Sequence, residues 1–172
     1  MLLEAMHSTD LDTVQALIQA GYDVNFSSSP DATQPLHYAL VTEKAEEMVC
    51  LLLGAGANVD SRIPDRDTPL IVASAMGQRY IVKILLQAKA EVNAVGFEDC
   101  TALHRAIQQW EQEIAMELLS NGADPEIQNA FGDSPFLLAC AMGNIEVLQL
   151  MINNNMLKSP NCMNQLKQNA LH

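Results

Sequence analysis

A short phrase returns four times along this chain of 172 residues, at nearly constant spacing. Its leucine or phenylalanine falls at Leu36, Leu70, Leu103 and Phe136, in steps of 34, 33 and 33 residues. The four phrases are Gln34-Pro35-Leu36-His37, Thr68-Pro69-Leu70, Thr101-Ala102-Leu103-His104 and Ser134-Pro135-Phe136. Self-similarity at a period of about 20 to 50 residues is typical of repeat proteins. The sequence therefore predicts an array of similar structural units.

Other residues recur in register with this phrase. An alanine follows each leucine or phenylalanine by three residues, at Ala39, Ala73, Ala106 and Ala139. Each unit closes on a related run, at residues 56–60, 90–93 and 122–124, and residues 21–25 close an earlier unit. Residues three apart share one face of a helix. We expect the alanines to point inward, where a small side chain lets neighbouring helices approach.

Within one unit the pattern predicts two short amphipathic helices. Thr68 suits an N-cap and Pro69 the first helical position, where a missing N–H is harmless. The first helix then runs to about Met76, Gly77 ends it, and apolar residues between 81 and 86 give a second helix one broad apolar face. One such pair cannot bury its apolar face alone, so the units are expected to stack and share a core.

The period and the phrase resemble the ankyrin repeat and its T-P-L-H-x-A signature. The resemblance implies an all-α solenoid of helix-turn-helix units with β-hairpin fingers. We assign units to residues 1–25, 26–60, 61–93, 94–126 and 127–158, the first being an N-terminal cap. Residues 159–172 are either the start of a truncated sixth repeat, because Asn169-Ala170-Leu171-His172 resembles the opening phrase, or a C-terminal tail. The first interpretation implies a fragment of a longer protein.

The resemblance also places fingers at residues 27–33, 62–67, 95–100 and 128–133. Gly132 matches the turn glycine of the family, whereas Arg66 and Asp99 depart from it. A turn that needs a positive φ disfavours residues with a Cβ. The sequence therefore leaves the hairpin geometry of the two middle fingers open.

Proteins of this family bind partners on a concave face formed by fingers and first helices. The usual contact positions correspond here to residues 41–42, 75–76, 108–109 and 141–142. Methionine adapts to irregular partners, and aromatic and arginine side chains are enriched in binding hot spots. The expected partner-binding residues are Tyr38, Met76, Phe97, Arg105, Gln109, Trp110, Phe131 and Met142.

Three of these residues have a structural alternative. Phe131 precedes the turn glycine, and it either packs the hairpin or meets a partner. Trp110 stands where Gly77 and Gly143 end their helices, so it either prolongs the first helix and displays its ring or covers the turn between helices. Tyr38 faces either the groove or the adjacent helix.

No pattern in the sequence predicts a chemical centre. His37 and His104 belong to the repeat phrase, and in the family such histidines hydrogen-bond within and between repeats. The four cysteines are Cys50, Cys100, Cys140 and Cys162. They have no C-x-x-C spacing and favour a reducing compartment, the cytoplasm or the nucleus. We expect no catalytic residue, no metal and no cofactor, and the longest apolar runs are too short to cross a bilayer.

The chain is acidic, with a formal net charge of −12. Acidic residues gather in the loops, at Asp65, Asp67, Glu98, Asp99 and Asp133. Such a field repels phosphate backbones and argues against a nucleic-acid ligand. Two interpretations of the charge remain: a partner with a basic surface, or solubility of a monomeric repeat protein.

The leading hypothesis is a protein-binding module, an adaptor or scaffold that recognises a protein or peptide through a rigid concave face. An alternative is the substrate-recognition arm of a larger enzyme or of a cullin-type ubiquitin ligase complex. A third hypothesis makes the chain a substrate, because Asn25 and Asn93 resemble ankyrin asparagines that are hydroxylated. Enzymatic activity of the domain itself is the class that the sequence supports least.

Overall fold

A computed structural model describes residues 1–26 and 34–157 of the chain. These residues form ten α-helices and one short 3-10 helix, and they contain no β-strand. The helices are α1 (Leu2–His7), α2 (Leu11–Gln19), α3 (Pro35–Ala39), α4 (Ala45–Gly54), α5 (Pro69–Ala75), α6 (Arg79–Gln87), η1 (Phe97–Asp99), α7 (Ala102–Gln108), α8 (Gln112–Ser120), α9 (Pro135–Met142) and α10 (Ile145–Asn153). The expected all-α repeat architecture is confirmed. Within these residues no helix has both the length and the apolar character needed to cross a membrane.

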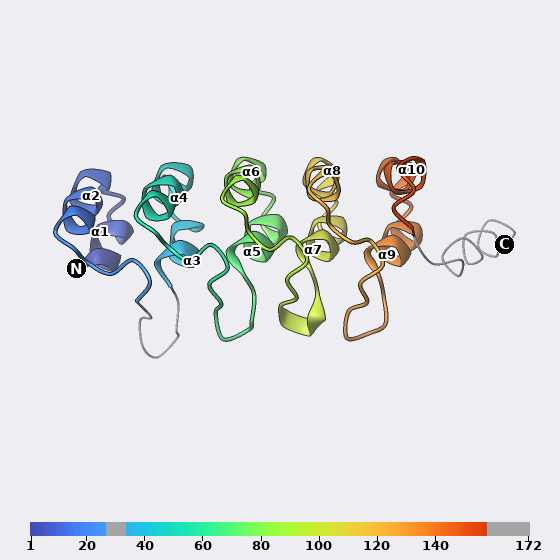
Figure 1. Ribbon diagram of the computed structural model, residues 1–172, viewed down its shortest axis with the longest axis horizontal. Helices are drawn as coiled ribbons and strands as arrows, with labels where there is room; N and C mark the ends of the chain where they lie inside the picture. Colours follow the sequence, from blue (N-terminus) through green and yellow to red (C-terminus); the bar gives the residue numbers. More distant parts are fainter. Residues whose placement is uncertain (27–33, 158–172) are drawn as a thin grey trace, which may run out of the picture. The chain divides into compact units, whose positions relative to one another are not determined.

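The chain divides into two compact units. Unit 1 consists of Met1–Ala73 and Gln78–Glu91, and unit 2 consists of Ser74–Gly77 and the chain from Val92 onward. Within unit 1, α1 packs against α3, and α4 packs against both α2 and α6 (Figure 1). Within unit 2, α7 packs against α9 and α8 against α10. Each unit thus has one layer of first helices and one of second helices, while the exact repeat boundaries stay a prediction.

The first helices begin at the residues that the repeated phrase predicts. The Ser134 hydroxyl accepts a hydrogen bond from the Leu137 N–H at 3.2 Å, and the Thr68 hydroxyl accepts one from the Ile71 N–H at 3.4 Å. Such N-caps satisfy backbone donors that the helix leaves without a partner. A proline follows each of these caps and begins the helix. The repeated phrase is therefore a helix-start signal.

Helices α5, α7 and α9 end in the same backbone arrangement, and here one expectation is wrong. Trp110 does not prolong α7, which ends at Gln108. Its φ is 62°, close to the 70° of Gly77 and the 68° of Gly143. The Glu111 N–H donates to the Ala106 carbonyl at 2.9 Å. In the same way, the Gln78 N–H after Gly77 donates to the Ala73 carbonyl, and the Asn144 N–H after Gly143 donates to the Ala139 carbonyl. This hydrogen bond holds the residue before its donor in the left-handed conformation, whether that residue is glycine or tryptophan.

The core follows the repeated residues. The phrase residues Leu36, Leu70, Leu103 and Phe136 are buried, and the four alanines three residues later are completely buried. Burying a large apolar side chain contributes about 1.5 to 3 kcal/mol. The inward position of the alanines is thus confirmed, because a larger side chain would not fit at these contacts without strain.

The three fingers within the described residues are tight loops without β-strands. In each, one backbone hydrogen bond spans four residues and another closes the turn: Ile63 to Asp67 with Arg66 to Ile63, Gly96 to Cys100 with Asp99 to Gly96, and Asn129 to Asp133 with Gly132 to Asn129. One such crossing is too little for a ladder, which corrects the expected β-hairpins. Arg66 (φ 68°) and Asp99 (φ 53°) take the left-handed conformation of Gly132, so the loops close without the family glycine. The finger expected at 27–33 lies outside the described residues.

Candidate protein-interaction surface

His104 joins the start of α7 to the finger that follows in the chain. The Thr101 hydroxyl accepts from the His104 N–H at 3.4 Å, and His104 Nδ1 accepts from the Thr101 N–H at 3.0 Å, a reciprocal capping box. Because Nδ1 is an acceptor, the ring proton lies on Nε2, which donates to the Asp133 carbonyl at 3.0 Å. Burial lowers the pKa of His104 below its ordinary value of 6.5, which favours the neutral ring.

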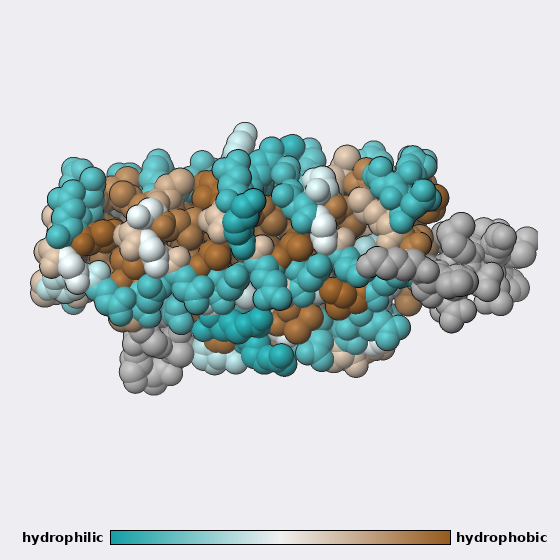
Figure 2. All heavy atoms as spheres, in the orientation of Figure 1, coloured by the Kyte–Doolittle hydropathy of each residue, from teal (hydrophilic) through white to brown (hydrophobic). Residues whose placement is uncertain are grey.

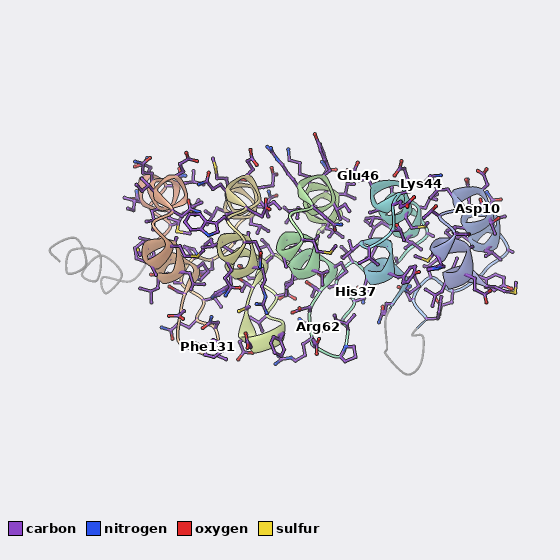
Figure 3. The ribbon with its side chains drawn as sticks, turned by 180° about the vertical axis from the view of Figure 1, so that it is seen from behind. Asp10, His37, Lys44, Glu46, Arg62 and Phe131 are labelled. Carbon is purple, nitrogen blue, oxygen red and sulfur yellow. The ribbon has the colours of Figure 1, made fainter. Side chains whose placement is uncertain are left out.

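His37 makes the equivalent connection from α3. Its Nε2 donates to the Asp67 carbonyl at 3.1 Å, and its Nδ1 lies 3.5 Å from the Ser61 hydroxyl. The N-cap Gln34 makes no side-chain capping bond. Burial again lowers the histidine pKa. The expected bonds between repeats are confirmed for both histidines, and the expected bond within a repeat is confirmed for His104 (His37 is labelled in Figure 3).

Asn25 and Asn93 connect the closing segments of successive repeats. The Asn93 amide donates to the Gly122 carbonyl at 3.2 Å, and its oxygen accepts from the Asp124 N–H at 2.8 Å. Asn25 donates to the Gly56 carbonyl at 3.0 Å and accepts from the Asn58 N–H at 2.7 Å. These bonds give both side chains a structural task. Their hydroxylation stays a prediction, which a mass gain of one oxygen atom on the corresponding peptides would test.

Trp110 displays an aromatic ring at a helix end in unit 2. Its side chain is 56% exposed, so it does not bury itself over the turn between α7 and α8. A left-handed backbone costs a residue with a Cβ about 1 to 2 kcal/mol. The position therefore combines backbone strain with an exposed apolar surface, and neither stabilises the fold.

Phe97 and Phe131 lie on adjoining fingers of unit 2. Phe131 is 69% exposed and Phe97 is 49% exposed. The Ala130 N–H donates to the Glu98 carbonyl at 2.9 Å, so one backbone bond joins the residue after Phe97 to the residue before Phe131. The exposure of Phe131 (labelled in Figure 3) disagrees with a role in packing its own finger.

Arg105 holds the Phe97 finger against α7. One guanidinium nitrogen donates to the Phe97 carbonyl at 3.2 Å, and another donates to Gln108 Oε1 at 3.2 Å. Arg105 thus orients the finger from within, a role that the sequence did not predict. Whether it also contacts a partner stays a prediction.

The remaining expected residues are divided between the two units. Met76 and Gln109 are exposed and Met142 is half-buried, and all three belong to unit 2. Tyr38 belongs to unit 1, where its hydroxyl lies 2.7 Å from His7 Nδ1. It lines a polar recess with Val41, Thr42 and residues of the α1–α2 turn. Seven of the eight expected residues therefore belong to one unit.

A groove of about 730 Å³ on α2, α4 and α6 of unit 1 was not predicted from the sequence. None of the expected binding residues lines it. One sequence signal could have revealed it: Gly54 ends α4, whereas α2, α6 and α8 end at Gln19, Gln87 and Ser120.

Residues 1–26 and 34–157 contain no cluster of three or more His, Cys, Asp or Glu side chains that could hold a metal ion. Among the cysteines of these segments, Cys50 is an exposed free thiol and Cys100 a buried one. Cys140 is half-buried, and burial raises the pKa of its thiol. Cys162 lies outside the described residues.

Comparison with known proteins agrees with the geometry. A family described as ankyrin repeats (3 copies) matches residues 2–96, 40–129 and 103–172. The chain is 31% identical over 128 residues to neurogenic locus notch homolog protein 1 of Homo sapiens, and 32% identical over 127 residues to that of Mus musculus. The protein of the same name from Danio rerio is 30% identical over 127 residues. Each match covers 74% of this chain but only 5% of the relative.

The family matches extend from residue 2 to residue 172. The paired helices, the capping phrase and the bonds between successive repeats agree with them. This chain therefore belongs to the ankyrin-repeat family.

Proposed function

We propose that this chain is an adaptor or scaffold module that binds a partner protein or peptide through unit 2. The ankyrin repeat is a protein-interaction fold. The proposed binding surface consists of the exposed aromatic residues Phe97, Trp110 and Phe131, together with Met76, Gln109 and Met142. Aromatic side chains with few rotatable bonds lose little entropy on binding and are frequent hot spots.

Trp110 is the observation that carries the proposal. Two other first helices end in a glycine at the same left-handed position, and a glycine would avoid the strain. A tryptophan there brings backbone strain and an exposed ring, which are both unfavourable in an isolated domain. A partner that buries the ring offsets both effects.

The fingers of the proposed surface are held in place before a partner arrives. Arg105 fixes the Phe97 carbonyl, and the backbone bond between Ala130 and Glu98 joins the two fingers. A surface that is already ordered loses less conformational entropy on association.

Charge suggests the nature of the partner. The exposed residues Glu98 and Asp133 lie on the same fingers as Phe97 and Phe131, within a chain of net charge −12. We propose a partner with a basic surface around its apolar contact residues. Exposed charges are screened by salt, so the association rate should fall as ionic strength rises. We also propose a cytoplasmic or nuclear site, because Cys50 is an exposed free thiol, and imaging of the tagged full-length protein tests it.

Site-specific photo-crosslinking in cells tests the proposed function. A photo-reactive phenylalanine analogue is placed at position 97, at position 131 or, as the control, at the 68% exposed Tyr80 on α6 of unit 1. We expect a shared protein adduct at positions 97 and 131 that is absent at position 80. Adducts of equal yield at all three positions would reject the proposed surface.

A further inference from the structure

The second helices of unit 1 form an apolar groove that is separate from the surface proposed above. Ile18 of α2, Cys50 and Leu51 of α4, Ala55 just after α4, and Ile84 of α6 line it. Figure 2 shows hydrophobic atoms exposed between polar side chains in the α2 and α4 part of unit 1. Ile18, Leu51 and Ile84 are only half-buried, so aliphatic surface remains available for contact.

Gly54 keeps the groove open. A Cβ added at this residue would meet no atom within 4 Å, and unlike Gly56, which follows the helix at a φ of 86°, it has no positive φ. Backbone geometry therefore does not require a glycine here. Helices α2, α6 and α8 all carry a longer side chain as their last residue. An alanine at such a site would leave the unfolded chain less conformational freedom and so favour the fold, which means that the glycine has no stabilising role.

The charged side chains that line the groove are all negative. The charged residues that line it are Glu46 and Glu47, both exposed in the first turn of α4. Figure 3 labels Glu46 on the side of unit 1 opposite the finger that carries Arg62. An apolar floor beside two carboxylates complements a ligand that has aliphatic side chains on one face and cations at its flank.

We propose that this groove binds an amphipathic helix of a partner protein, with aliphatic side chains against Ile18, Leu51 and Ile84. Lysine or arginine residues at the flank of that helix pair with Glu46 and Glu47. A helix presents such anchors at intervals of three and four residues, and a groove between packed helices receives them. This second binding site lies on unit 1 and does not depend on the aromatic surface of unit 2.

A designed peptide tests the proposal. The probe is a synthetic helix with leucines along one face and lysines at its flank, and its matched control has the same composition with the leucines spread around the helix. Fluorescence anisotropy of the labelled peptide gives the affinity, and alkylation of Cys50 by iodoacetamide, followed by peptide mapping, gives the location. At a free peptide concentration about ten times the dissociation constant, alkylation should slow about tenfold, because only the free protein reacts.

Four variants of the full chain make the test specific. Gly54→Leu fills the groove and should abolish the protection of Cys50, while Gly54→Ala should retain it. Glu46→Lys with Glu47→Lys should weaken binding of the lysine peptide and improve binding of its glutamate counterpart. Phe97→Ala with Phe131→Ala should leave peptide binding unchanged. A negative result for the groove on unit 1 is therefore distinguishable from a negative result for the binding surface on unit 2.

Three results would overturn the proposal. The first is peptide binding that Gly54→Leu does not change, and the second is a Cys50 that stays fully reactive at saturating peptide. The third is a concentration-dependent dimer, seen by analytical ultracentrifugation, that Gly54→Leu abolishes. That dimer would assign the groove to a second copy of this chain.

Discussion

At Trp110 the backbone conformation, rather than the side chain, determines stability. We expect Trp110→Gly to raise the free energy of unfolding by about 1 to 2 kcal/mol, because glycine adopts a left-handed φ without steric cost. Trp110→Ala removes the same ring but keeps a Cβ, so it should lack this gain. Urea unfolding of the two variants measures the difference. Equal stability of the glycine and alanine variants would show that the 62° φ carries no strain.

Protonation of the buried histidines should destabilise the fold. His37 and His104 have a pKa below the ordinary 6.5, so the unfolded chain takes up their protons first as the pH falls. Stability is therefore fully present above about pH 6.5 and declines below it. In His104 the added proton on Nδ1 also opposes the Thr101 N–H.

Glutamine at these positions supplies the control for the pH effect. At position 104 a glutamine can make the reciprocal capping bond, and at neither position does it titrate. We expect His37→Gln with His104→Gln to lose less stability than the wild type between pH 7.5 and pH 5, as thermal unfolding followed by circular dichroism will show. Parallel curves for the two proteins would contradict the role of the histidines.

The structural roles of residues that recur in the repeated phrase could be predicted from the sequence. The inward alanines recur in all four phrases and the histidines in two, and the positions predicted for both were correct. The conformation of Trp110 could not be predicted in this way. A tryptophan in place of the usual glycine favoured a longer α7, but the backbone hydrogen bond from the Glu111 N–H to the Ala106 carbonyl ends the helix before it.

Among the helices, two glycines should respond oppositely to alanine. Gly77 ends α5 with a φ of 70°, and an added Cβ would lie 2.6 Å from Glu111 Oε1. Gly54 ends α4 without a positive φ and with open space around it. We expect Gly77→Ala to destabilise the protein by about 1 kcal/mol or more and Gly54→Ala to stabilise it by about 0.4 to 1 kcal/mol. Chemical denaturation measures both, and a change of the same sign in both would contradict this account.

Helices were more predictable than fingers. Capping residues and prolines mark the starts of α5 and α9, and glycines mark their ends, so sequence gives their bounds to within a residue or two. The fingers depend on a few hydrogen bonds across each loop and on left-handed residues such as Arg66, whose side chain gives no such signal. The family glycine is therefore a preference that the loop can do without.

Across a whole unit, hydrogen bonds between successive repeats join the helix pairs. Asn93→Ala removes both bonds to the next closing segment, and we expect a loss of about 1 to 3 kcal/mol in the free energy of unfolding. The control is Asn121→Ala, because that exposed amide bonds to Glu117 in the helix it follows, and to no other repeat. Equal losses in the two variants would argue that these bonds do not stabilise the stack.

The candidate surface was only partly predictable at this scale. Family positions and exposed aromatic types led to residues that mostly share unit 2. The sequence could not show that Tyr38 belongs to unit 1, or that Arg105 holds a finger, because both depend on contacts between distant segments. The groove on α2, α4 and α6 also arises only when three repeats pack together.

The most direct test of the central claim compares binding with stability in one variant, Phe97→Ala with Phe131→Ala. The ligand is the partner identified by photo-crosslinking, and calorimetry gives its affinity for the wild type and the variant. We expect the affinity to fall at least about tenfold, because these side chains act as hot spots, while the melting temperature stays unchanged because both rings are exposed. Unchanged affinity, or a melting temperature that falls together with binding, would contradict the claim that these fingers are a binding surface.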